Sequence, residues 1–160
     1  MTIRVLGIDP GTAVTGYGIV EPCDGRVGRL IECGVIRTHS KDQLCDRLRD
    51  LYEGLTEVIA RHNPTVVAVE GIFYARNVRT TVILGHTRGA VLLAAAQAGL
   101  DVAEFSPALV KKTVVGAGGA RKAQISYMVQ QLLNLKTPPT PNDAADGIAI
   151  ALTYLLTRRQ

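Results

Sequence analysis

The chain has 160 residues, of which 47% are hydrophobic and 20% charged, so it predicts a single globular domain over residues 1–160 and excludes a disordered protein. Trp is absent and aromatic residues make up only 4%, so we expect an aliphatic core. The net charge of +4 is unevenly spread, because residues 71–136 hold 8 Lys and Arg against 2 Asp and Glu. This middle segment is where we expect a polyanion to bind.

The cysteines and the apolar segments indicate the compartment. Cys23, Cys33 and Cys45 are odd in number and form no CxxC pair, which favours a reducing compartment and buried thiols over disulfides or a zinc site. The most apolar segment, residues 89–96, is far shorter than the roughly 20 residues of a membrane span, and no charged leader precedes an apolar core. We therefore expect a cytoplasmic protein that has no contact with membranes.

The first half of the chain predicts strands on both sides of one amphipathic helix. Leucines recur at spacings of three and four in residues 41–62, and Pro64 ends this helix before an apolar strand at residues 65–70. A strand, a helix and a strand in this order imply a right-handed crossover and parallel pairing with the first strand. Three strands joined by turn signals precede the helix as an antiparallel meander: residues 3–9, 15–21 and 29–38.

The second half predicts one more strand and several helices. Residues 78–98 form a helix that is apolar nearly all round, with Gly85 and Gly89 four apart. This helix lies either between the sheet and other helices or, as we favour, in the seam of a dimer. The remaining expected elements are a strand at 101–105, a helix that Ser106 and Pro107 begin, a flexible glycine segment at 116–119, a core-facing helix at 125–133, and a last helix from the N-cap Asn142 to about residue 157.

Four carboxylates fall where these elements would form a site. Asp9 and Glu70 each end a buried strand, and the predicted parallel pairing makes them neighbours at one edge of the sheet. Asp143 and Asp146 are three residues apart and lie on one face of a helical turn. Each acid alone has a structural alternative, such as capping a turn or complementing the helix dipole. Their joint occurrence in three separate segments favours a functional site.

Carboxylates gathered in this way repel one another unless a cation lies between them. Oxygen ligands without a Cys or His cluster favour a hard ion, either Mg²⁺ or Mn²⁺. Two such ions about 4 Å apart can hold the attacking water and the leaving oxygen of a phosphodiester. Together with the basic middle segment, the acids predict phosphoryl transfer on a nucleic acid.

Basic and aromatic residues near these acids are candidates for DNA contact. Lys111 and Lys122 flank the glycine segment, and we favour phosphate contact for them over ordinary solvated lysines. Phe73 follows the second acid in a loop, where it is either a core anchor or a wedge that stacks on an exposed base. Further predicted DNA contacts are Tyr74, Arg76, Asn77, Arg79, Lys112 and Arg121.

Several motifs, in order over essentially the whole chain, resemble the RuvC family of Holliday-junction resolvases. They are Gly7-Ile8-Asp9-Pro10-Gly11 with Thr15-Gly16-Tyr17-Gly18, Val69-Glu70 with Phe73 and Asn77, Gly85 to Gly89 with Arg88, Val110 to Gly116, and Asp143-Ala144-Ala145-Asp146.

The resemblance implies an α/β fold of the ribonuclease H-like type, with a five-stranded mixed sheet flanked by helices. It further implies a homodimer paired through the long apolar helix, Mg²⁺-dependent nicking of two strands of like polarity at a four-way junction, and a RuvAB branch-migration complex as partner. The family's acidic quartet falls on Asp9, Glu70, Asp143 and Asp146, its lysines on Lys111 and Lys122, and its junction-centre aromatic on Phe73.

Two other functions were weighed. Asp9 to Thr12 also resembles the phosphate loop of actin-like ATPases and sugar kinases, but that fold needs two such domains and 160 residues without a duplicated motif cannot supply them. A non-catalytic module that binds branched DNA is the second alternative. The four acids argue against it, because uncompensated carboxylates repel phosphate.

Overall fold

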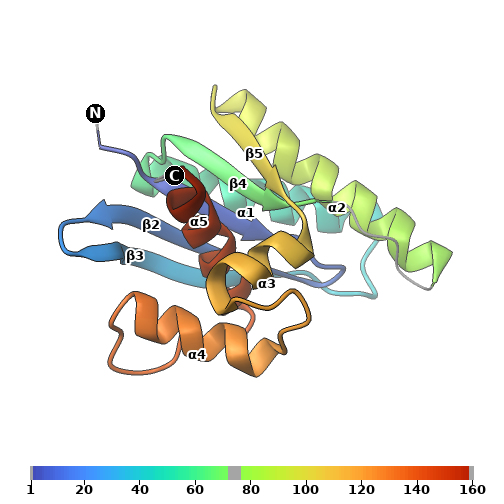
Figure 1. The fold of residues 1–160 in the computed structure, drawn as a ribbon. Helices are drawn as coiled ribbons and strands as arrows, with labels where there is room; N and C mark the ends of the chain where they lie inside the picture. The colour runs from blue at the N-terminus through green and yellow to red at the C-terminus, as the bar shows by residue number, and fades with distance from the viewer. Residues whose placement is uncertain (1, 72–76, 159–160) are drawn as a thin grey trace.

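The fold is a mixed five-stranded sheet between two layers of helices (Figure 1). This computed structural model describes residues 2–71 and 77–158. The strand order is β3-β2-β1-β4-β5, in which β1 pairs antiparallel with β2 and parallel with β4. The predicted five-stranded mixed sheet is therefore confirmed, with the strands β1 (Val5–Asp9), β2 (Val14–Cys23), β3 (Arg26–Arg37), β4 (Val66–Glu70) and β5 (Asp101–Phe105).

Each face of the sheet has its own aliphatic core. On one face, residues such as Leu6 and Val67 pack under α1 and α2, and on the other face Val5 and Ala68 pack under α3, α4 and α5. The parallel strands β1 and β4 are thus apolar on both faces, as buried parallel strands require. The helices are α1 (Leu44–His62), α2 (Val78–Gln97), α3 (Pro107–Val115), α4 (Lys122–Leu132) and α5 (Ala144–Arg158).

Helix α5 lies directly on the backbone of β1 and β2 because glycines line the contact. A Cβ on Gly16 would come within 2.1 Å of the Asp143 carbonyl oxygen, and one on Gly7 within 2.1 Å of the Gly147 carbonyl oxygen. From the helix side, a Cβ on Gly147 would lie 2.6 Å from the Cα of Tyr17. Gly147 costs the helix about 1 kcal/mol in propensity against Ala, and this close approach is the reason it is there.

Several predicted boundaries need correction. Helix α1 begins at Leu44 rather than at residue 41, because a turn closed by the Asp42 N–H on the His39 carbonyl precedes it. Helix α4 begins at Lys122, three residues earlier than its apolar pattern indicates. Helix α5 begins at Ala144, so the residue before it is Asp143 and Asn142 is not its N-cap.

The expected burial of all three cysteines is wrong. Cys45 is exposed on the outer side of α1, and Cys23 and Cys33 are only partly buried. Cys33 of β3 packs against the edge of one aliphatic core but is not enclosed by it. Among the described residues, no helix has the length and apolar character needed to cross a membrane.

Candidate active site

The parallel pairing of β1 and β4 brings the first two acids together. Ile8 lies opposite Val69 in the register, so the residues that follow them, Asp9 and Glu70, end neighbouring strands at the same edge. Pro10 follows β1 and Gly71 follows β4, and the Gly71 N–H donates to the Phe105 carbonyl of β5 at 2.7 Å. The sheet therefore fixes the backbone on both sides of this pair of carboxylates.

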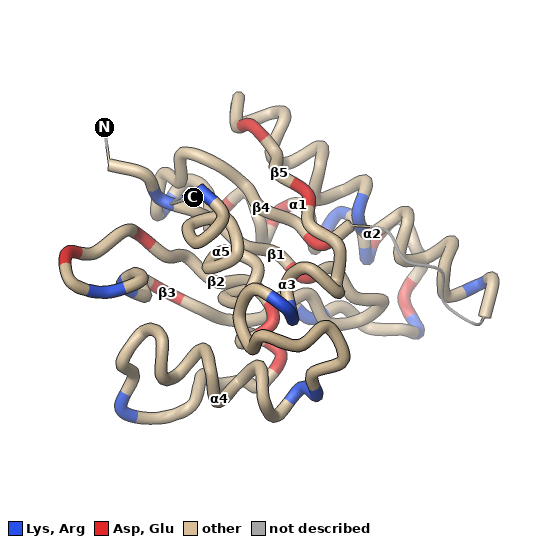
Figure 2. Tube along the Cα trace, in the orientation of Figure 1, with Lys and Arg blue, Asp and Glu red and all other residues tan. Residues whose placement is uncertain are grey.

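The start of α5 brings the other two acids to the same edge. Asp9 pairs with Gly16 across β1 and β2, and the glycine contact described above seats the first turn of α5 on that position. Asp146 then lines the same cavity as Asp9 and Glu70, whereas Asp143 lies nearer to solvent. Figure 2 shows acidic positions gathered where β1, α3 and α5 meet, with basic positions of α3 beside them.

A cavity of about 430 Å³ opens at this edge of the sheet. Three carboxylates and two lysines face it, and apolar residues of the three helices on that side form the rest of its wall. A polar group held against an apolar wall is poorly hydrated, so charges there interact more strongly than they would in water. The lining residues are Asp9, Glu70, Asp146, Lys111, Lys122, Pro107, Val110, Ala120, Ile125, Ala149 and Ile150.

Burial and mutual repulsion disturb the protonation of the acids. Burial raises the pKa of Asp9 to about 9, and the neighbouring Glu70 carboxylate and the charge of Asp146 add to this rise. Burial is likewise the main cause that raises the pKa of Glu70 and of Asp146. These three groups cannot all be ionised at neutral pH unless positive charge is added among them.

The two lysines differ in how they supply positive charge. Lys122 Nζ lies 2.5 Å from Asp143 Oδ1 and 3.4 Å from Asp146 Oδ2, so it bridges the aspartate that precedes α5 and the one in its first turn. Its bond to Asp143 is the main cause that raises the pKa of Lys122. Lys111 faces the same cavity, where its charge opposes the rise in the pKa of Glu70 and of Asp146.

The chemistry of these donors suits a hard divalent cation. Carboxylate oxygens are the ligands that Mg²⁺ and Mn²⁺ prefer, and a divalent charge among the acids would reverse the rise in their pKa values. Within residues 2–71 and 77–158, no three His, Cys, Asp or Glu side chains already stand at the spacing of metal ligands. The metal site therefore stays a prediction. Metal binding would require the carboxylates at this edge of the sheet to move closer together.

The comparison with protein families identifies the chain. Residues 5–154 match the family described as "Crossover junction endodeoxyribonuclease RuvC". This chain belongs to the RuvC family. The match spans all five strands and the helices up to residue 154 of α5, including the ends of β1 and β4 and the start of α5, and it confirms the resemblance found in the motifs.

Relatives and solved structures within the RuvC family agree with this assignment. The crossover junction endodeoxyribonuclease of Halorhodospira halophila is 50% identical over 151 residues, covering 94% of this chain and 89% of the relative. That of Pelotomaculum thermopropionicum is 48% identical over 150 residues, covering 94% and 91%. The RuvC of T. thermophilus in complex with Holliday junction substrate is 36% identical with a TM-score of 0.90, covering 98% and 95%.

A more distant solved structure supports the fold alone. The yeast mitochondrial Holliday junction resolvase Ydc2 superimposes with a TM-score of 0.72 at 16% identity, covering 98% of this chain and 79% of its own. The predicted ribonuclease H-like architecture of the RuvC family is thereby confirmed for this chain.

The predicted DNA-contact residues fall into three groups. Phe73, Tyr74 and Arg76 lie outside the described residues. Asn77 is the N-cap of α2, where its side chain accepts a hydrogen bond from the Arg79 N–H at 2.9 Å, so it has a structural role whatever else it contacts. The remaining three side chains, those of Arg79, Lys112 and Arg121, are exposed to solvent.

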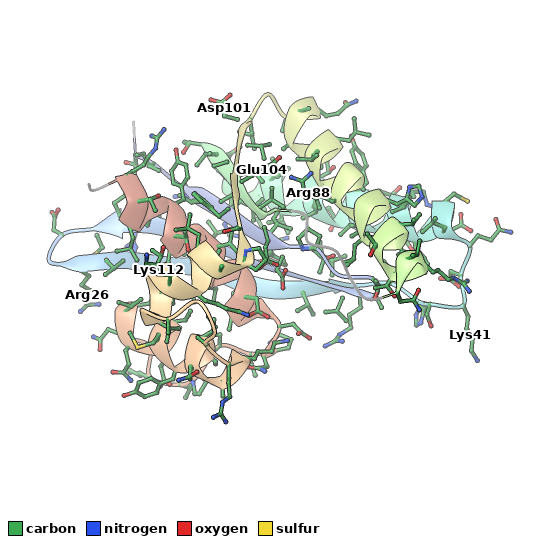
Figure 3. All side chains as sticks on the ribbon, turned by 45° about the vertical axis from the view of Figure 1, so that its right-hand side comes forward. Arg26, Lys41, Arg88, Asp101, Glu104 and Lys112 are labelled. Atoms are coloured by element: carbon green, nitrogen blue, oxygen red, sulfur yellow. The ribbon has the colours of Figure 1, made fainter. Side chains whose placement is uncertain are left out.

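Two arginines near the RuvC-family site were given no site role from the sequence, although Arg88 belongs to one of the motifs that resemble the family. Arg47 of α1 donates to the carbonyl of Thr12 in the loop that follows Asp9. Arg88 of α2 is 12% exposed and pairs with Glu104 of β5 at 2.6 Å, on the strand that borders Glu70 (Figure 3). Arg88 carried a usable signal, because a charged residue stands alone within an otherwise apolar stretch of helix. Arg47 carried none, because its helix face alternates charged and apolar residues.

Proposed function

We propose that this RuvC-family protein is a Holliday-junction resolvase that makes paired, symmetric nicks in two strands of like polarity at a four-way DNA junction, in homologous recombination and DNA repair. One observation carries the proposal: carboxylates from β1, β4 and α5 meet in a single cavity that two lysines also face. The T. thermophilus relative described in complex with Holliday junction substrate supports the choice of DNA.

The acids and the lysines of this cavity would have different roles in the reaction. Asp9, Glu70, Asp143 and Asp146 would hold divalent metal ions, which we propose to be two Mg²⁺ per subunit with Mn²⁺ able to substitute. When bound, these ions supply a nucleophilic water and stabilise the leaving oxygen of the phosphodiester. Lys111 and Lys122 add positive charge where the phosphate charge increases in the transition state, and the apolar wall of the cavity keeps bulk water away.

A homodimer would present two such sites to the two-fold symmetry of the junction. Helix α2 supports this arrangement, because the three apolar side chains Val78, Val82 and Leu93 are 77%, 53% and 52% exposed. Gly85 and Gly89 lie on the same face, and a Cβ built on either meets nothing within 4 Å. In the described part of the chain this face is open, as a helix that packs against a second copy would be.

The dimer has its own test. Val82→Arg places a charge on the open face of α2, and we expect it to convert the dimer to a monomer in sedimentation analysis. Tyr127→Arg is the matched control, because Tyr127 is 60% exposed on α4 and lies outside the proposed seam. A protein that sediments identically with and without Val82→Arg would contradict the proposed seam.

The proposed activity is tested with a labelled synthetic junction. The protein is incubated with a four-way junction or a linear duplex of the same sequence, in Mg²⁺, Mn²⁺ or EDTA, beside the Asp9→Asn variant. We expect symmetric, metal-dependent nicks in the junction alone, which the variant fails to make while still binding. Tight junction binding without nicking in either metal would instead favour the alternative, a non-catalytic branched-DNA module. A RuvAB partner is a prediction from the family alone, and a cytoplasmic location is a prediction from the cysteines and the apolar segments of the sequence.

A further inference from the structure

Lys122 occupies the position between Asp143 and Asp146, the two acids that α5 contributes to the site. Its ammonium group lies 2.5 Å from one carboxylate oxygen and 3.4 Å from the other. Lys111 faces the same cavity but makes no ion pair with any residue of the described ranges. The two lysines that flank the glycine segment therefore have different relations to the acids, although the sequence predicts phosphate contact for both.

We propose that Lys122 is a resident cation that holds Asp143 and Asp146 together in the metal-free protein and must leave them when a divalent ion binds. This inference rests on the proposed metal-dependent function. A lysine ammonium carries one charge and a divalent ion carries two, so both compete for the same carboxylate oxygens and the ion has the stronger interaction. The bridge thus keeps the aspartates in place without closing the site.

The bridge is weak enough to be displaced. The side chains of Lys122, Asp143 and Asp146 are 52%, 41% and 24% exposed, and an ion pair between exposed groups contributes only about 0–1 kcal/mol. The Lys122 side chain has a water-facing route out of the bridge, because it stands on the first residue of α4. It does not have to cross the packed core to leave the aspartates.

The glycine segment before α4 allows Lys122 to move without displacing the rest of the site. Gly116 ends α3 with a φ of 95°, and Cβ atoms built on Gly116 or Gly119 would meet nothing within 4 Å. Beyond this segment, Ile125 and Val129 anchor α4 in the core. The start of α4 can therefore shift by small changes in the glycine segment while the helix stays packed. A displaced Lys122 becomes available to a DNA phosphate, so one side chain would serve the acids first and the substrate second.

The test measures metal binding without DNA. Mn²⁺ affinity is determined by calorimetry, with the free Mn²⁺ signal in electron paramagnetic resonance as a second readout, for wild type, Lys122→Gln and Lys111→Gln. Each variant removes one positive charge beside the acids, so general electrostatics strengthens Mn²⁺ binding in both. We expect Lys122→Gln to bind about fivefold more tightly than Lys111→Gln, because the ion no longer displaces an ion pair of about 1 kcal/mol.

The outcomes separate this inference from the proposed function. Equal gains in the two variants, or a weaker affinity in Lys122→Gln, would overturn the role of Lys122 while leaving a metal-binding site in place. If wild type and both variants bind no Mn²⁺, the metal-dependent function fails and this inference fails with it. Circular dichroism of each variant confirms that the fold is retained before affinities are compared.

Discussion

Buried carboxylates at the two ends of strand β1 have opposite electrostatic surroundings. At its start, Glu21 of β2 is 4% exposed and is held by Arg4 at 2.9 Å and Arg29 at 2.7 Å, and its bond to Arg29 is the main cause that lowers its pKa. At its end, Asp9 is buried beside Glu70, and burial raises its pKa to about 9. The Glu21 end is electrostatically complete because two arginines pair with its carboxylate, whereas the Asp9 end is incomplete because the charge of Lys122 only partly offsets the rise in the pKa of Asp9.

A second complete cluster lies where β3 meets the end of α1. Glu32 accepts hydrogen bonds from Tyr17 Oη at 2.7 Å and from Arg61 Nη2 at 2.6 Å, and it also contacts His62. The bond to Arg61 is the main cause that lowers the pKa of Glu32 to about 2. Acids with arginine partners therefore stabilise this fold, whereas Asp9 and Glu70 have no arginine partner in the described ranges and fit the proposed cation site.

The largest effect is expected from removing an acid of the cluster that has no arginine partner in the part of the chain that the structure describes. Glu70→Gln should lower the rate of junction nicking by about 10²-fold or more, since it removes an oxygen ligand and a charge from the reacting centre. Its unfolding temperature should stay near that of wild type, because Glu70 forms no salt bridge in the described ranges and its charge repels the acids beside it. The measurement is single-turnover cleavage beside thermal unfolding. A variant that cuts normally would remove Glu70 from the site.

The next largest effect tests the contact that places α5. Gly16→Ala puts a Cβ where only 2.1 Å separates it from the Asp143 carbonyl oxygen, so the helix must move away from Asp9. We expect a loss of about 3 kcal/mol in the free energy of unfolding, together with reduced nicking. Gly85→Ala is the control, because the added Cβ meets nothing within 4 Å. Equal urea midpoints for both variants would contradict the close packing.

A smaller effect, on stability, is expected from removing the charge of Glu32, an acid that has an arginine partner. Glu32→Gln should cost about 1–2 kcal/mol at pH 7, since Tyr17 and Arg61 lose a charged partner. The folded-state pKa of Glu32, about 2, lies below its ordinary value of 4.5, so its contribution is present above pH 4.5 and is lost as the pH falls toward 2. Urea unfolding of both proteins across this range should therefore converge at low pH. A constant difference would show that Glu32 does not act through its charge.

The smallest effect concerns the basic surface outside both kinds of cluster. Lys112→Ala should reduce the slope of log K against log salt for junction binding by about 1, as expected for one phosphate contact. Lys41 is the matched control, because it is also an exposed lysine and Figure 3 shows it far from Lys112. An unchanged slope in Lys112→Ala, or the same loss in Lys41→Ala, would mean that Lys112 does not bind the DNA specifically.

The sequence predicted the sheet and three of the converging acids because these depend on local patterns. Apolar runs that end in Asp9 and Glu70, with an amphipathic helix between them, determine both the parallel pairing and the shared edge. Asp146 could be predicted to join these acids because it lies in the first turn of a helix, on the same face as Asp143. The bridge from Lys122 to Asp143 was beyond reach, since it joins residues 21 apart across a loop whose path no periodicity specifies.

Other features depended on three-dimensional packing that no single stretch encodes. Helix propensity alone predicts that Gly147 destabilises α5. Its role follows from the close contact of α5 with the backbone of Tyr17, which only the three-dimensional structure shows. The arginine partners of Glu21 and Glu32 lie on other strands and helices, so the sequence could not separate complete acids from incomplete ones. That separation identifies the site, and it needed the structure.

The most direct test of this separation is the effect of Mg²⁺ on thermal unfolding at pH 8. Wild type, Asp9→Asn and Glu21→Gln are each melted with EDTA and with excess Mg²⁺. We expect Mg²⁺ to raise the Tm of wild type and of Glu21→Gln by the same amount and to leave Asp9→Asn nearly unchanged, since only Asp9 belongs to the incomplete cluster. An equal rise in all three proteins, or no rise in wild type, would contradict it.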